Sequence, residues 1–128
     1  MGKPVSSDVK RVQTTPLNTK VNKEAFKNFK DYCAYRGYAM NVVLETFMQQ
    51  YANGRFYLTE EEVMKWKSDD GEVDVLNTTF NKEIYTNFKA ACKGNKYFVK
   101  HVVTAFMEKL VTENFILEYV SVDAINKE

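Results

Sequence analysis

The sequence contains an internal repeat, which constrains the fold more than any other feature. Residues 17–24 (LNTKVNKE) recur 59 positions later as residues 76–83 (LNTTFNKE), and the register continues without a gap to residues 58 and 117. Of these 42 pairs, 16 are identical, including phenylalanine, cysteine and methionine pairs. Two copies of one unit predict equivalent environments and a pseudo-two-fold axis. Because a copy of about 40 residues cannot bury a core alone, we expect the two copies to fold onto each other.

Each copy is predicted to run strand, helix, helix. Leu17, Thr19 and Val21 alternate with polar residues, which is the periodicity of a strand, and the second copy repeats the alternation. Asn22 and its counterpart Asn81 then stand where a helix N-cap is expected. The helical pattern that follows breaks at residues 36–37 (Arg-Gly) and 94–95 (Gly-Asn), and a second helical pattern comes after each break.

The predicted helices have apolar faces at helical spacing. The first helix of each copy presents Phe26, Phe29 and Cys33, and Tyr85, Phe88 and Cys92. The second helix presents Met40, Val43, Leu44, Phe47, Met48 and Tyr51, and Val99, Val102, Val103, Phe106, Met107 and Leu110. The two cysteines lack the number of a disulfide scaffold and the clustering of a zinc site, so we expect buried free thiols.

These patterns predict a mainly α fold with a short two-stranded antiparallel β-ribbon. A strand of about five residues is marginal in water unless it pairs. Pairing between the two copies of one chain and pairing between two chains both satisfy this need. The expected organisation is a flexible N-terminal arm at 1–15, repeat 1 at 16–58, an acidic linker with a short helix at 59–74, repeat 2 at 75–120, and a tail at 121–128.

Charge and composition favour a cytoplasmic binding protein over an enzyme. The net charge is +1, but seven of the 17 acidic residues lie between Thr59 and Val75, so one surface of the molecule can still be basic. No apolar run is long enough for a membrane span, and the N-terminus lacks the apolar segment of a secretory signal. Because the sequence assembles no nucleophile with a base, no carboxylate pair and no metal cluster, we expect no catalytic residues, no cofactor and no metal site.

The strand, helix, glycine-containing turn and helix resemble the ribbon-helix-helix superfamily of Arc and MetJ. Residues 18–24, through Arg36 and Gly37, to Met40 and Asn41 align with the Arc pattern without a gap. The resemblance covers residues 17 to about 51 and 76 to about 110. It implies a tandem ribbon-helix-helix pseudo-dimer, similar in architecture to the TraY-like and staphylococcal SmpO-like accessory proteins of conjugative relaxosomes. That similarity includes the aromatic residues after each second helix, at 56–58 and 115–117.

The resemblance implies that the outer face of the ribbon enters the major groove of double-stranded DNA. Base readout is then assigned to Asn18, Lys20, Asn77 and Thr79. Phosphate contacts are assigned to the start of each second helix and to two further cations, namely Met40, Asn41, Val99, Lys100, Lys23 and Arg36. The usual Ser or Thr cap of that helix is replaced by Ala39 and Phe98. Because Lys20 corresponds to Thr79, we expect a DNA site that is not a perfect palindrome.

Three functions remain open. A relaxosome accessory protein would bind near an origin of transfer on a plasmid, contact a relaxase, and assemble as a homo-oligomer of pseudo-dimers on adjacent sites. An autoregulatory transcriptional repressor of a mobile element would use the same DNA-binding chemistry at a promoter. A helical, antitoxin-like interaction module would bind no DNA, and its aromatic segments would serve as docking surface.

Overall fold

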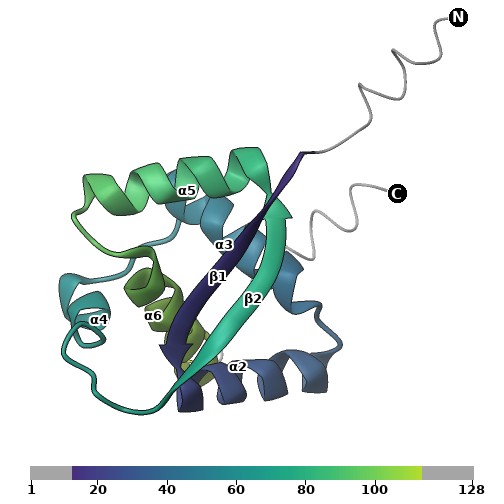
Figure 1. Cartoon of the computed structure of the whole chain (residues 1–128), viewed down its shortest axis with the longest axis vertical. Helices are drawn as coiled ribbons and strands as arrows, with labels where there is room; N and C mark the ends of the chain where they lie inside the picture. Colours follow the sequence, from purple (N-terminus) through teal and green to yellow (C-terminus); the bar gives the residue numbers. More distant parts are fainter. Residues whose placement is uncertain (1–12, 114–128) are drawn as a thin grey trace, which may run out of the picture.

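The computed structural model describes residues 13–113, which form two strands and five helices in two similar halves (Figure 1). The elements are β1 (Thr14–Asn22), α2 (Lys23–Arg36), α3 (Met40–Ala52), α4 (Glu60–Met64), β2 (Val73–Asn81), α5 (Lys82–Gly94) and α6 (Val99–Glu113). The predicted order of strand, helix, helix is confirmed in both halves, and so is the short helix in the linker. Most of the predicted N-terminal arm, the predicted tail and the aromatic residues at 115–117 lie outside the described residues.

The two strands pair antiparallel with each other within the chain. The register runs from Thr14 opposite Asn81 to Asn22 opposite Val73, with Asn18 opposite Asn77. Each strand has nine residues rather than about five and starts two residues before the expected repeat boundary. Backbone hydrogen bonds explain the extra length, because the Lys82 N–H donates to the Gln13 carbonyl (2.9 Å) and the Lys23 N–H donates to the Glu72 carbonyl (2.8 Å), one at each end of the ribbon.

Both strands lead directly into helices through asparagine caps, as predicted. The Asn22 side chain accepts a hydrogen bond from the Ala25 N–H (2.9 Å), and the Asn81 side chain accepts one from the Ile84 N–H (3.0 Å). An acceptor at this position satisfies a first-turn amide that has no partner inside the helix. The angle between ribbon and helix is therefore fixed in the same way in both halves.

The four long helices pack across the halves beneath the ribbon. Helix α2 packs against α6, and α3 packs against α5, while both strands cross in front of the helices (Figure 1). At the centre the Phe47 and Phe106 rings stack, with centroids 4.1 Å apart and planes inclined by 10°. The predicted apolar faces are buried, apart from half-buried Met40 and Val99 at the helix starts.

The two cysteines are free and buried, as predicted. Burial raises the pKa of the Cys33 thiol to about 11, against an opposing effect of Arg36, and burial alone raises the pKa of the Cys92 thiol to about 12. A thiol that is both shielded and protonated at neutral pH is a poor nucleophile. Both cysteines therefore act as core residues.

The linker helix α4 is docked on α6. A capping box starts it, in which the Thr59 hydroxyl accepts from the Glu62 N–H and the Glu62 carboxylate accepts from the Thr59 N–H. Val63 is fully buried, and Glu62 accepts from Lys109 Nζ of α6 at 2.6 Å. This part of the acidic linker is thus fixed to the core. Within residues 13–113, no helix is long and apolar enough to cross a membrane.

The turn between α5 and α6 has a left-handed residue that is not glycine. Gly37 ends α2 with φ of 73°, and its counterpart in the second half is Lys96, with φ of 66°. The predicted break at Gly94 and Asn95 is where α5 ends, with Gly94 as its last residue and Asn95 as its C-cap. The two turns keep one geometry because the Tyr38 and Tyr97 N–H groups donate to the carbonyls of Cys33 and Cys92, respectively (2.8 and 2.9 Å).

Replacing Lys96 with glycine is expected to stabilise the protein by roughly 0.5–1 kcal/mol, because a side chain is strained in the left-handed region and glycine is not. Chemical denaturation monitored by circular dichroism measures the change. As a control, Lys93→Gly removes the same charge from within α5 and is expected to destabilise by roughly 0.5–1 kcal/mol. A destabilised Lys96→Gly variant would contradict the strain at this turn.

Glu62→Gln is expected to lower stability at pH 7 by about 1 kcal/mol or less, with the difference disappearing in acid. Burial raises the pKa of Glu62, but hydrogen bonds from Lys109 and Thr59 outweigh it and leave the pKa below its ordinary value. The stability from the ionised carboxylate is therefore present above the ordinary glutamate pKa and lost as pH falls through the lowered one. Urea denaturation from pH 7 to pH 3 tests this, with exposed Glu61→Gln as the control. A pH-independent deficit would contradict the ion pair.

Candidate nucleic-acid interface

The outer face of the ribbon brings together the four residues predicted for base readout. Side chains alternate along each strand, so one set packs on the helices and the other projects into solvent. The middle of the outward set consists of three facing pairs, Pro16 with Thr79, Asn18 with Asn77, and Lys20 with Val75. All six residues are exposed, and the two asparagines lie at the middle of the face.

The inner face of the ribbon fixes which side chains point outward. Leu17, Val21, Leu76 and Phe80 are buried against the helices. A slip of one residue would expose all four of these side chains and bury polar ones, so the register is strongly specified. The end of β2 is also anchored, because the Asn81 N–H donates to the Glu45 carboxylate of α3 at 2.7 Å.

The exposed face differs at its two ends. Lys20 faces Val75 at one end, whereas its counterpart Thr79 faces Pro16 at the other. Val73, expected in the linker, is 54% exposed and lies opposite Asn22, extending the apolar part beside Val75. Val73 was not predicted to belong to the strand, although the alternation of residues 73–75 (VDV) was a signal for it. The cationic end of the face is therefore also its more aliphatic end.

The start of α3 lies beside the ribbon. Met40 and Asn41 line a cleft of about 430 Å³ together with Lys30 of α2 and residues 74–78 of β2. The N-cap residue, Ala39, makes no side-chain capping hydrogen bond. First-turn N–H groups have no acceptor within their helix, and the helix dipole makes this end positive. The cleft thus presents backbone donors, with a lysine, next to the exposed ribbon face.

The start of α6 lines a second cleft beside the ribbon, of about 180 Å³. Lys100 and His101 of α6 face Lys20 of β1 across it, and Trp66, Lys67 and Asp69 of the linker close it. Burial first, then Lys100 and Lys67, lower the pKa of His101, so the imidazole is neutral at pH 7. The contribution of the linker was missed by sequence analysis. Its one signal is the spacing of Val63 and Trp66, three residues apart on the linker segment.

Of the predicted phosphate contacts, Asn41 and Lys100 are exposed, Met40 and Val99 are half-buried, and Lys23 and Arg36 line neither cleft. Lys23 Nζ lies 3.6 Å from a Glu72 carboxylate oxygen. The Arg36 guanidinium lies over the Tyr32 ring, 3.8 Å from its centroid. The structure therefore places Lys23 and Arg36 in local interactions outside the two clefts.

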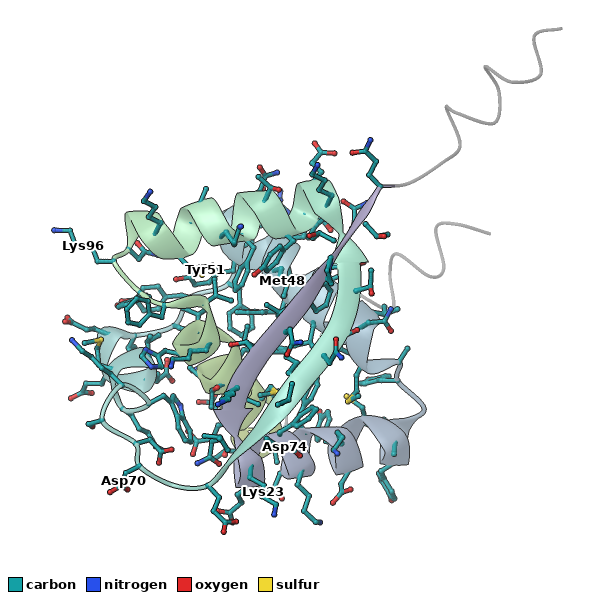
Figure 2. The ribbon with its side chains drawn as sticks, viewed as in Figure 1. Lys23, Met48, Tyr51, Asp70, Asp74 and Lys96 are labelled. Carbon is teal, nitrogen blue, oxygen red and sulfur yellow. The ribbon has the colours of Figure 1, made fainter. Side chains whose placement is uncertain are left out.

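Acidic residues border one end of the ribbon. Asp69 accepts a hydrogen bond from the Asn22 side chain at 3.0 Å. Glu72 comes directly before β2, and Asp74 is the second residue of that strand. Figure 2 shows Asp74 and Lys23 together at this end, with Asp70 in the loop that leads to it. These carboxylates lower the electrostatic potential where the linker joins the ribbon. Asp69 and Asp74 also line one cleft each, so they offset part of the positive charge there.

Within residues 13–113, no group of three or more histidine, cysteine, aspartate or glutamate side chains is placed to hold a metal ion. Comparison of the chain with protein-family models, with curated proteins and with solved structures finds no match.

Proposed function

We propose that the chain is a tandem ribbon-helix-helix pseudo-dimer that binds double-stranded DNA in a sequence-specific manner. Two contacts between repeat counterparts support the pseudo-dimer. Asn18 pairs with Asn77 at the middle of the ribbon, and Phe47 stacks on Phe106 in the core, so residues 59 positions apart meet each other at both places. A residue can meet its own counterpart only beside a two-fold axis, which would run from the ribbon into the core.

The observation that carries the proposal is the exposed polar centre of an otherwise well-packed two-stranded ribbon. A ribbon of this width fits the major groove of B-form DNA. Asn18 and Asn77 can each pair with adenine N6 and N7, Lys20 can donate to guanine O6 and N7, and Thr79 can contact a thymine methyl group. Solubility alone does not require identical amides at the centre of the face in both copies.

The two clefts supply the sequence-independent part of binding. Backbone amides at a helix N-terminus carry no net charge, but their N–H groups bind phosphate. Phosphate contacts set the position of a protein on the duplex. Amides at Met40 and Asn41 and at Val99 and Lys100 would do so on either side of the ribbon, with the Lys100 ammonium adding charge on one side. The start of α6 would therefore bind the duplex more strongly than the start of α3.

The biological setting that we propose is a cytoplasmic relaxosome. Pseudo-dimers would bind adjacent sites at an origin of transfer and contact a relaxase, by the resemblance in architecture described above. Autoregulatory repression on a mobile element uses the same interface and is the second candidate. The exposed ribbon face favours both over an interaction module that binds no DNA. Selection from a random duplex pool, followed by mapping of the enriched site to a nicking site or to a promoter, separates the two candidates.

The double variant Asn18→Ala/Asn77→Ala is expected to lose most site preference while keeping its stability. Both side chains are exposed, and each bidentate contact to a base is worth roughly 1–3 kcal/mol of discrimination. Electrophoretic mobility shift on the selected site and on a scrambled duplex measures the preference. The matched control is Asn28→Ala/Asn87→Ala, an identical pair of exposed asparagines on α2 and α5. Unchanged preference in the ribbon variant would remove the readout assignment.

Lys20→Ala and Lys100→Ala are each expected to make the salt dependence of DNA binding shallower by about one unit in the slope of log K against log salt. Lys27→Ala is the control, because its ammonium already pairs with Asp31 at 2.9 Å and lines neither ribbon cleft. Fluorescence anisotropy at several salt concentrations gives the slopes. Equal slopes for all three variants would exclude the Lys20 and Lys100 ammonium groups from the DNA interface.

A further inference from the structure

A groove of about 650 Å³ runs beside the turn between α5 and α6 and shares no lining residue with the two ribbon clefts. Its apolar part comes from Ala90, Cys92, Tyr97, Phe98 and Val99, and its cations are Lys89, Lys93 and Lys96. Figure 2 shows Lys96 projecting from this turn at the side of the molecule, away from the ribbon. The groove thus combines an apolar lining with cations, and Val99 at the start of α6 is the residue that it shares with the proposed phosphate contacts.

An aromatic ring at the groove is left open to solvent. The Phe98 side chain belongs to a residue that is 65% exposed, although its ring centroid lies 5.5 Å from that of His101. Single exposed apolar residues are common on protein surfaces. An exposed ring that lines an open, cation-bearing groove is less common and provides apolar area that a bound segment can cover.

The first half of the chain serves as an internal comparison. The counterparts of Lys93, Lys96 and Phe98 are Ala34, Gly37 and Ala39, and the counterpart of Ala90 is the acidic Asp31. The core positions of the two halves are similar, so the fold does not need the lysines or the phenylalanine. At these positions the second half is basic and aromatic, whereas the first half has two alanines, a glycine and an aspartate.

We propose that this groove binds an acidic segment of a partner protein, which inserts an aromatic or aliphatic side chain beside Phe98 while its carboxylates pair with Lys89, Lys93 and Lys96. The chemistry of the lining favours a peptide over nucleic acid as the occupant. The backbone of a DNA duplex could pair with the lysines, but its bases are stacked on each other and are not available to cover Phe98 and Tyr97. A peptide satisfies both.

Binding at this groove does not depend on the ribbon face or on its two clefts, since they share no lining residue with the groove. Val99 lines the groove, but it is proposed to meet DNA through its backbone amide alone. We expect most of the affinity to come from the buried apolar side chain, with the exposed ion pairs contributing selectivity and association rate. The peptide and a DNA duplex should therefore bind to one molecule at the same time. Failure of DNA binding and failure of peptide binding are separate outcomes.

The test uses the full chain and three fluorescein-labelled peptides, measured by fluorescence anisotropy. The peptide DDELFDE carries both carboxylates and apolar side chains, NNQLFNQ lacks the charges, and DDEGGDE lacks the apolar pair. Saturable binding of the first peptide alone is expected, and it should persist when a saturating amount of duplex DNA is present. Equal binding of the uncharged peptide, or no saturable binding of the first at about millimolar concentration, would overturn the proposal.

Two variants that restore the residues of the first half locate the site. Phe98→Ala and Lys93→Ala are each expected to weaken binding of the first peptide by about fivefold or more. Tyr35→Ala removes an aromatic residue that is 86% exposed on the first half, and Lys27→Ala removes a cation there, so both should bind as the wild type does. Thermal unfolding verifies that the variants are folded. If the groove variants keep peptide affinity but lose duplex affinity, the lysines belong to the DNA interface and the proposal is wrong.

Discussion

The pairing of β1 with β2 is the constraint on which the rest of the structure depends. Each strand has the other as its partner within the described residues, and they are separated by two helices and a linker. Once they pair with Asn18 opposite Asn77, their buried residues form one apolar surface for the four long helices. The asparagine caps then start α2 and α5 at fixed angles, and each of these helices meets the second helix of the other half. Neither half can bury its apolar surface without the other.

Structural features that depend on residues close together in the sequence could be predicted, whereas features set by tertiary packing could not. Asn22, the apolar faces and the linker helix follow from alternation, helical spacing and capping chemistry, which depend on neighbouring residues. The left-handed Lys96 was not predictable, because Gly94 nearby gave a stronger local signal than the equivalence with Gly37. Likewise, no local pattern shows that the linker around Trp66 lies beside the start of α6.

The candidate site shows the same division. Alternation along the strands was enough to place Asn18, Lys20, Asn77 and Thr79 on one face, and that face is exposed. The roles suggested for Lys23 and Arg36 depend on where long side chains lie, and the structure shows these side chains beside Glu72 and Tyr32, respectively. The two halves also differ in the facing pairs of the ribbon, where Lys20 corresponds to Thr79, and in the turn after α5, where Lys96 corresponds to Gly37. At the centre of the core, Phe47 stacks on its own counterpart, Phe106.

The location of both strands in one chain changes how the fold responds to concentration. When two separate chains form such a ribbon, dilution favours the separated chains, and folding is lost together with association. Here the second strand is covalently attached, so the ribbon forms by an intramolecular reaction whose equilibrium does not change on dilution. A few molecules per cell would be as completely assembled as a concentrated solution. Because the two strands are also encoded separately within one chain, a mutation can change one side of the exposed face while the other side is retained.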